Sequence, residues 1–282
     1  MRIARIAGPS GPEFAVQSSD GSWVTFGSLG IEAATTAEVV AAAAGLPGAA
    51  VAEQRGGLTD PQFLSPIVAP GKVIALGLNY ADHMRETGQE PPVSPRVFGK
   101  FASSIIGPYD DIVVDERLTQ QADYEGELAV VIGRRAKYVA EEDALGIVFG
   151  YLVCNDVSAR DAQKIDGQLD RSKSFDTFCP LGPWITTADE VPDPQALKIR
   201  TKVNGEIRQD SSTSQMYFRT AYLIHYLSLG MTFEPGDVIL TGTPHGVGWA
   251  MKPPRFLAPG DVVECEVEGL GLLRNRVVAP SR

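Results

Sequence analysis

The stretch DYEGELAVVIG, residues 123–133, decides how the rest of the chain is understood. Residues 128–132 are apolar and rich in valine, a pattern typical of a buried β-strand. Successive side chains of a strand point to opposite faces, so Glu125 and Glu127 share one face. Gly126 between them has no side chain and lets another group approach closely. We therefore expect a core strand with two carboxylates at one end.

A second apolar segment, Val148–Cys154, predicts another core strand and runs into Asn155 and Asp156. By themselves, Glu125 and Glu127 more often mark a strand end in water, because carboxylates are seldom buried without a partner. Asp156 just past a strand end favours the alternative, since ligating groups commonly occupy such positions on a rigid scaffold. Three carboxylates form an all-oxygen set, which suits Mg²⁺, Mn²⁺ or Ca²⁺ rather than zinc.

Composition sets limits on the function. The chain has 282 residues, 44% of them hydrophobic and 21% charged, which suits one large domain or a main domain with a small appendage. Its net charge of −10 argues against general binding to nucleic acids or to anionic membranes. A small anionic substrate remains compatible, because a bound cation reverses the local field.

The cysteines and histidines limit the kinds of metal site and cross-link that the chain can form. Cys154, Cys179 and Cys265 are too few and too widely spaced for a disulfide framework or a zinc motif. Three histidines in the whole chain argue against a histidine-rich metal site. We see no secretory leader at residues 1–8 and no apolar run long enough to cross a bilayer. These features predict a cytoplasmic protein.

Along the chain, residues 1–65 predict a small N-terminal α/β domain, and residues 66–282 a second, larger domain. In the first, residues 37–44 are alanine-rich and predict a helix ending at Gly45. In the second, Asn204 and Gly205 predict a hairpin turn, and residues 216–229 an amphipathic helix. Strands dominate and no βαβ rhythm is present, which indicates an α+β, mostly β, fold.

Several polar residues lie near these elements. His83 and Glu86 are three residues apart and would meet on one face of a short helix. Such a pair is a common surface contact, and also the usual pairing for a general base. Residues 79–95 hold glycine and prolines and predict a lid. A helical turn is expected from Asp156 onward, and Lys173 lies in a Gly/Pro-rich loop, where a lysine is ordinarily solvated.

Seven motifs in order resemble the fumarylacetoacetate hydrolase superfamily, over roughly residue 70 to the end. They are GLNYADH (77–83), YEGEL (124–128), NDVSARD (155–161), KSFD (173–176), VNGE (203–206), LTGTP (240–244) and GD (260–261). The N-terminal unit resembles the short extra domain of many bacterial members.

The resemblance implies a fold and a site. The fold is a mixed β-sandwich roll, in a protein that forms a homodimer. Mg²⁺ or Mn²⁺, with Ca²⁺ as an alternative, is held by three carboxylates, and a catalytic dyad and a lysine act beside the ion on a small-molecule 2-oxo or 2,4-dioxo acid. The implied residues are Glu125, Glu127 and Asp156 for the metal, His83, Glu86 and Lys173 for catalysis, and Gln163, Thr243 and Arg160 for substrate binding.

The implied chemistry passes through an enolate. The leading expectation is hydrolysis of a C–C bond in a 2,4-dioxo acid; the alternatives are an isomerase of the 2-hydroxyhepta-2,4-diene-1,7-dioate type and an oxaloacetate decarboxylase. Leu78 stands where acylpyruvate hydrolases of the family tend to carry arginine, which argues against oxaloacetate or a simple acylpyruvate as substrate. A catalytically silent binding protein would be expected to have lost His83, Glu86 or Lys173, and all three are present.

Overall fold

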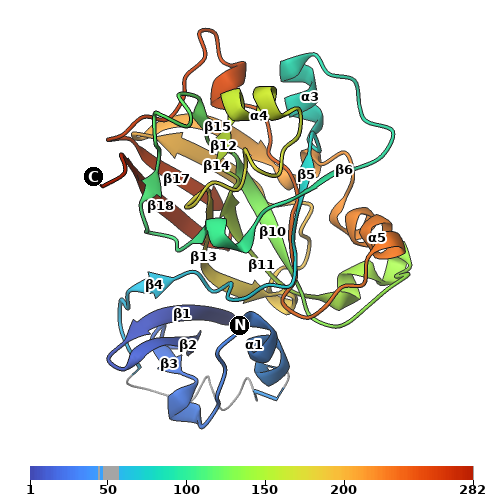
Figure 1. Ribbon diagram of the computed structural model, residues 1–282. Helices are drawn as coiled ribbons and strands as arrows, with labels where there is room; N and C mark the ends of the chain where they lie inside the picture. Colours follow the sequence, from blue (N-terminus) through green and yellow to red (C-terminus); the bar gives the residue numbers. More distant parts are fainter. Residues whose placement is uncertain (44, 47–56, 282) are drawn as a thin grey trace.

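The computed structural model describes residues 1–43, 45–46 and 57–281. Two β-sheets face each other across the main core (Figure 1). In the described residues the larger sheet has this strand order: β3 (Trp23–Thr25), β2 (Gly11–Gln17), β1 (Arg2–Gly8), β13 (Cys179–Thr187), β11 (Val148–Asn155), β10 (Gly126–Ile132), β16 (Val238–Leu240), β5 (Val73–Gly77) and β6 (Arg96–Gly99). Two short strands join it beside this path: β4 (Phe63–Leu64) on β1 and β7 (Ile105–Ile106) on β13.

The second sheet and a two-stranded ribbon complete the β structure. The second sheet has the order β15 (Glu206–Ser212), β14 (Lys198–Val203), β17 (Val262–Val267), β18 (Gly271–Val278) and β8 (Ile112–Val113). The ribbon pairs β12 (Ser158–Ala159) with β9 (Ala122–Asp123). The described α-helices are α1 (Thr36–Ala43), α3 (Ala81–Thr87), α4 (Arg160–Asp166) and α5 (Thr220–Gly230). The mostly β architecture predicted from the sequence is confirmed.

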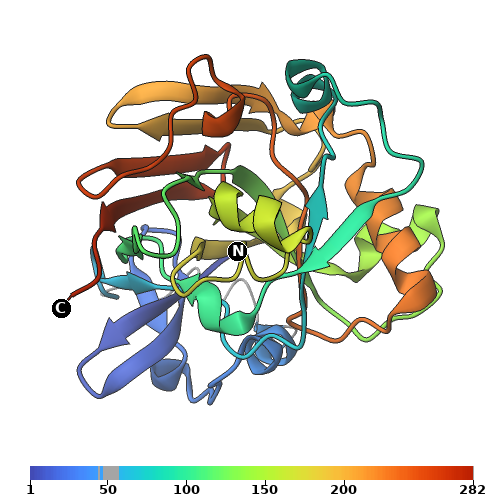
Figure 2. The ribbon, with the colours of Figure 1, turned by 45° about the horizontal axis from the view of Figure 1, so that its top comes forward.

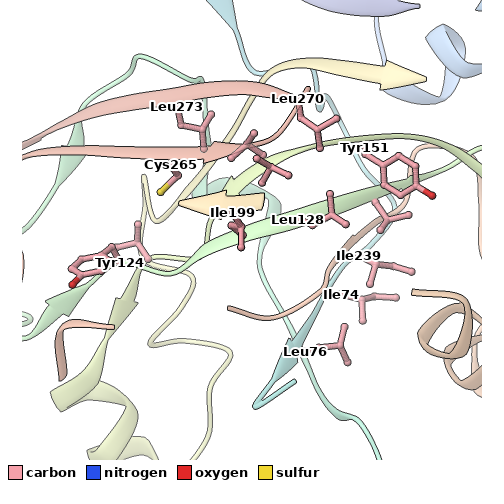
Figure 3. Packing of buried hydrophobic residues seen from close by; sticks show 14 of the residues in the cluster. Ile74, Leu76, Tyr124, Leu128, Tyr151, Ile199, Ile239, Cys265, Leu270 and Leu273 are labelled. Carbon is pink, nitrogen blue, oxygen red and sulfur yellow. The ribbon is translucent and has the colours of Figure 1, made fainter. Parts of the chain in front are cut away.

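Strand β10 is buried on both faces, as its continuous apolar run requires. Leu128 and Val130 point into the main core between the two sheets, whereas Ala129 and Val131 pack in a second cluster on the opposite face. Figure 3 shows the main core, where Leu128 of β10 lies among Ile199 of β14 and side chains of β17 and β18. The strand is thereby fixed firmly, and the two glutamates at its start are held in place.

The N-terminal strands extend the larger sheet. Strand β1 pairs antiparallel with β13, with Ile3 opposite Ile185. Helix α1 packs Val39 against Ile3 and Phe14 in a separate small core. The helix expected at residues 37–44 is present, although Ala44 lies outside the described residues. The division of the chain into residues 1–65 and 66–282 stays a prediction.

The predicted hairpin turn is confirmed, because Asn204 and Gly205 adopt positive φ angles of 53° and 79° between β14 and β15. The helix expected at residues 216–229 begins later, at Thr220. The residues before it are bonded to another segment: Met216 forms an isolated β-bridge with Tyr80, and Phe218 donates its N–H to the side-chain oxygen of Asn79 and accepts from its side-chain nitrogen at its own carbonyl oxygen.

The helical turn expected from Asp156 also begins later, at Arg160. Residues 158 and 159 form β12 and pair with β9 instead, with Ser158 opposite Asp123. Figure 1 places α3 and α4 at the end of the sheets that lies away from the N-terminal strands. The candidate catalytic residues gather at this end.

Candidate metal centre and active site

Strand pairing brings the three predicted carboxylates together. Gly126 at the start of β10 lies opposite Asn155 at the end of β11, so the glutamates of one strand meet Asp156 of the next. One ligand oxygen from each of Glu125, Glu127 and Asp156 lies within 4.8 Å of the others, and all three side chains are buried. The solvated alternative for the glutamates does not hold in the structure.

Lys173 lies between two of these carboxylates. Its Nζ donates to Oε2 of Glu125 at 2.7 Å and to Oδ2 of Asp156 at 2.6 Å. Burial by itself would lower the pKa of Lys173, but Asp156 and Glu125 raise it above its ordinary value. Lys173 is therefore a buried ammonium ion, not the solvated loop lysine that its local sequence suggests.

Sequence reasoning missed a second buried lysine. Lys100, directly after β6, donates to Oδ1 of Asp156 at 2.6 Å and to the carbonyl oxygen of Phe178 at 3.0 Å. A third bond goes to the carbonyl oxygen of Lys173. The signal in the sequence was a lone lysine at the end of a short apolar strand, and that position does not distinguish a buried lysine from a solvated one.

Arg160 holds Glu125 from the other side. Its guanidinium donates to Oε1 of Glu125 at 2.6 Å and to Oδ2 of Asp123 at 2.9 Å. Burial raises the pKa of Glu125, but Lys173 and Arg160 outweigh it and lower that pKa to about 2. Asp123 also accepts from the backbone N–H groups of Gly248 and Trp249, at 2.8 and 3.1 Å. Arg160 thus fixes a metal-ligand candidate and ties it to a neighbouring loop.

Glu127 differs from the other two carboxylates. Its Oε2 accepts from the backbone N–H of Gly242 at 2.8 Å, and none of the ion pairs among the described residues includes it. Burial, together with the negative charges of Asp156 and Glu125, raises its pKa well above the ordinary range. An ionised Glu127 would therefore have no directly paired cation among the described residues, and a bound metal ion would stabilise its charge.

The charges of the cluster fit a divalent cation. When ionised, Glu125, Glu127, Asp156 and Asp123 carry four negative charges, against three positive charges on Lys100, Lys173 and Arg160. The difference, three minus four, is one negative charge. A divalent cation would make it one positive charge, which the carboxylate of a bound acid would neutralise. The all-oxygen donor set suits Mg²⁺, Mn²⁺ or Ca²⁺.

The predicted histidine–glutamate pair forms on α3. Nδ1 of His83 lies 3.1 Å from Oε2 of Glu86, and His83 is buried. The other oxygen of Glu86 accepts from the backbone N–H of Gly246 at 2.9 Å, and the ring of Trp249 meets that of His83 edge to face. Glu86 therefore both orients the imidazole and attaches α3 to the loop after β16.

Asp82 supplies a second attachment that sequence reasoning missed. Its Oδ2 accepts from the hydroxyl of Ser211 at 2.5 Å and lies 2.9 Å from Nδ1 of His245. Its Oδ1 accepts from the backbone N–H of His83 at 2.8 Å. Asp82 thus links α3, β15 and the loop after β16, and holds the backbone of His83. Whether residues 79–95 open and close as a lid stays a prediction.

A cavity of about 820 Å³ joins these groups. His83, Glu125 and Lys173 line it, as do the predicted substrate-binding residues Gln163 and Thr243. The hydroxyl of Thr243 donates to the carbonyl oxygen of Gly126 at 3.0 Å and accepts from Gln209 at 2.8 Å, so its orientation is fixed. His83, the buried ammonium group of Lys173 and one carboxylate of the candidate metal site, Glu125, therefore line one cavity.

The chain is similar to known proteins over most of its length. The model of the fumarylacetoacetate (FAA) hydrolase C-terminal family matches residues 72–278. Oxaloacetate tautomerase FAHD2A, mitochondrial, from Homo sapiens is 51% identical over 222 residues, which cover 78% of this chain and 70% of that protein. The name of this relative contains oxaloacetate, whereas Leu78 led us to expect that oxaloacetate is not the substrate of this chain.

Two solved structures are similar over nearly the whole chain. A fumarylacetoacetate hydrolase from Exiguobacterium antarcticum is 41% identical with a TM-score of 0.88, covering 99% of this chain and 100% of that one. A 2-hydroxyhepta-2,4-diene-1,7-dioate isomerase from Mycobacterium marinum is 36% identical with a TM-score of 0.78, covering 100% of both chains. In the described residues, no helix is long and apolar enough to span a membrane. The chain belongs to the fumarylacetoacetate hydrolase family.

Proposed function

We propose that this protein is a divalent-metal-dependent tautomerase or isomerase of 2-oxo acids, which moves a proton between carbon and oxygen. The observation that carries the proposal is the shared cavity, where His83, held by Glu86, faces the same space as Lys173 and Glu125 of the carboxylate cluster. The names of the relatives support this reading over the hydrolase expected first, because a 51% identical protein is an oxaloacetate tautomerase and a 36% identical structure is a dienedioate isomerase.

His83 is the proposed acid–base group. The carboxylate of Glu86 accepts a hydrogen bond from Nδ1–H, so that in the neutral ring Nε2 is unprotonated and available to take a proton from the carbon beside the keto group. The protonated ring then gives that proton to the oxygen of the enolate, which completes the enol, and the same two steps in reverse convert enol to keto form; the chain is unchanged after each turnover. Glu86 stabilises the imidazolium form in between, because its carboxylate remains in contact with the ring.

The positive groups of the cavity stabilise the negative charge that appears as the proton leaves. Mg²⁺ or Mn²⁺ held by Glu125, Glu127 and Asp156 would supply Lewis-acid stabilisation of the enolate. Lys173 contributes an ammonium group lining the same cavity, while Arg160 holds Glu125 in position. Two polar side chains that line the cavity are available to a substrate: Gln163, from α4, and Thr243, from the loop after β16.

A hydrolase of 2,4-dioxo acids is the second candidate. The 41% identical structure with the higher TM-score is a fumarylacetoacetate hydrolase, and the same histidine could activate water instead of taking a proton from carbon. The difference lies in whether a C–C bond breaks. The preferred ion, the homodimeric state and a cytoplasmic location stay predictions.

The test uses protein that has been treated with EDTA and reloaded with Mg²⁺ or Mn²⁺. Freshly dissolved enol oxaloacetate is followed by its ultraviolet absorbance, and NMR identifies the product; acylpyruvates are followed in parallel. We expect metal-dependent conversion of enol to keto form without release of CO₂ or cleavage products. Formation of two fragments from an acylpyruvate would favour the hydrolase, and release of CO₂ from oxaloacetate would favour a decarboxylase. All three activities would be rejected if the reaction rates with the protein, with or without metal, equalled those in buffer containing no protein.

A further inference from the structure

Every oxygen of two candidate metal ligands already accepts a hydrogen bond from a cation. Oε1 of Glu125 accepts from Arg160 at 2.6 Å, and Oε2 accepts from Lys173 at 2.7 Å. Oδ1 of Asp156 accepts from Lys100 and Oδ2 from Lys173, each at 2.6 Å. Without a bound metal ion, these three cations neutralise the two carboxylates, so a divalent ion has to share the oxygens with them or displace one of them.

Two of the three cations are also anchored outside the ligand set. The fully buried side chain of Lys100 donates to the carbonyl oxygens of Lys173 and Phe178. Arg160 donates to Asp123, which is not one of the three candidate ligands, at 2.9 Å. Figure 2 shows α4, which begins at Arg160, facing the viewer, with β5 and β6 beside it. These additional bonds hold Lys100 and Arg160 in place whatever the ligand carboxylates bind.

The ammonium group of Lys173 has no such anchor among the described residues. Both of its hydrogen bonds go to candidate ligands, Glu125 and Asp156. Its Nζ lies 5.0 Å from the centre of the Phe98 ring, a distance at which an aromatic face attracts a cation. Lys173 also lines the cavity, and Lys100 does not. The ammonium group can therefore give up its bonds to the carboxylates and remain in the site, beside Phe98 and facing the cavity.

Electrostatic repulsion gives the ammonium group a reason to move. Mg²⁺ binds oxygen at roughly 2.1 Å, and Nζ of Lys173 is 2.7 and 2.6 Å from the two oxygens that it bridges. An ion bound to either of these oxygens would lie no more than about 5 Å from Nζ, where like charges repel strongly in a buried site. Metal binding therefore favours departure of the cation that is held by the ligand carboxylates alone.

We propose that Lys173 is an exchangeable counter-ion of the metal centre: it bridges Glu125 and Asp156 when no metal ion is bound, and gives up these bonds when a divalent cation binds. Its ammonium group then faces the cavity, where its charge pairs with the carboxylate of an incoming acid. This inference rests on the proposed function, in which Glu125, Glu127 and Asp156 hold the ion. Lys173 thereby weakens metal binding, and it becomes available to a substrate only after the ion has bound.

The first test is calorimetric titration of EDTA-treated protein with Mg²⁺. Lys173→Met should lower the dissociation constant of Mg²⁺ about 10- to 100-fold, because the ion no longer has to displace a charged hydrogen-bond donor. The matched control is Lys100→Met, which also removes a buried positive charge bonded to Asp156 and should tighten Mg²⁺ binding clearly less. Equal tightening in both variants would indicate a general effect of charge, and unchanged or weaker binding in Lys173→Met would show no competition; either result would overturn the proposal.

The second test uses the wild-type protein, so it does not depend on the folding of a variant that lacks a buried charge. In ¹⁵N-lysine-labelled protein, NMR follows the exchange of ammonium protons with water, which burial and hydrogen bonding slow. Lys173→Arg assigns the Lys173 signal. Saturation with Mg²⁺ should speed the exchange at Lys173 and leave that at Lys100 slow, because Lys100 keeps its carbonyl bonds. Exchange at Lys173 that stays as slow as without Mg²⁺ would overturn the proposal.

Failure of the proposed function gives a different result. The wild-type protein would then bind Mg²⁺ and show the faster exchange at Lys173, yet leave enol oxaloacetate to convert at the rate seen in buffer. Absence of Mg²⁺ binding to the wild type and to both methionine variants would reject the metal centre, and this inference with it.

Discussion

The Nζ atom of Lys100 lies 2.6 Å from Oδ1 of Asp156, and neither side chain is more than 1% exposed. This pair fastens the end of β6 to the end of β11 inside the candidate metal centre. It also satisfies two backbone carbonyl oxygens of the loop that carries Lys173. Lys100 is therefore expected to support the site without touching the substrate, because it does not line the cavity.

Replacing Lys100 with methionine should destabilise the metal-free protein strongly. Removing one partner of a buried ion pair costs about 3–5 kcal/mol, and we expect the lower end of this range because Lys173 stays beside Asp156. Urea unfolding followed by tryptophan fluorescence measures the loss. The matched control is Lys198→Met on the surface, which should change stability by less than about 0.5 kcal/mol. A loss as small for Lys100→Met would contradict the structural role of the pair.

Replacing Glu127 with glutamine should separate metal binding from folding. Burial and two neighbouring carboxylates disfavour the ionised form of Glu127, so its neutral isostere should leave the metal-free melting temperature unchanged or higher. Mg²⁺ affinity should fall by more than about 100-fold, beyond the loss typical of residues that only support a ligand. Thermal melting after EDTA treatment, with and without added Mg²⁺, checks both. The control is Glu116→Gln, at an exposed position, which should behave like the wild type. If Mg²⁺ raised the melting temperature of Glu127→Gln as much as that of the wild type, Glu127 would not be a metal ligand.

Replacing His83 with alanine should reduce turnover by about 10²- to 10⁴-fold, the usual contribution of a positioned general base. Mg²⁺ affinity should stay unchanged, since among the described residues no hydrogen bond or ion pair joins His83 to any of the three carboxylates. Glu86→Ala should lose a similar factor and the double variant little more, because the two side chains act as one unit. Steady-state kinetics checks this, with Glu90→Ala as the surface control. If the fold-losses in turnover of the two single variants multiplied in the double variant, His83 and Glu86 would not act as one unit.

The cysteines should be inert in the native protein. All three are buried, and burial raises the pKa of Cys265 to about 12 and that of Cys154 above its ordinary value. The hydrogen bond with Cys154 lowers the pKa of Cys179, so for this thiol burial away from the reagent is the reason for inertness. For Cys265 the thiolate fraction at pH 8 is then about one in 10⁴, and it increases as the pH rises toward 12. Ellman's reagent should titrate no thiol at pH 8 until the chain is unfolded. Val93→Cys, at a fully exposed position, should add one reactive thiol; rapid reaction of the wild-type protein would show that the core opens.

Much of the fold was predictable from local patterns. The apolar runs at residues 128–132 and 148–154 became the neighbouring strands β10 and β11, because both faces of the sheet are covered. The turn at Asn204 was predictable because few residues adopt a positive φ angle easily. Helix starts were less predictable: Met216 and Phe218, just before α5, are bonded to Tyr80 and Asn79, more than a hundred residues away in the sequence, and they lie outside the helix.

For the candidate site as well, some features were predictable from the sequence and others were not. By itself the sequence determined the two core strands, the three carboxylates at their ends and the helical spacing of His83 and Glu86, since these follow from the periods of a strand and a helix and from where each strand ends. Only the tertiary structure decided that Lys100 and Lys173 are buried against Asp156 and that Asp82 holds α3 to His245. These pairs join residues 56, 17 and 163 positions apart, and no local pattern specifies which distant charges will meet. Folding of the two sheets brings those charges together, and their low exposure to water makes the pairing strong.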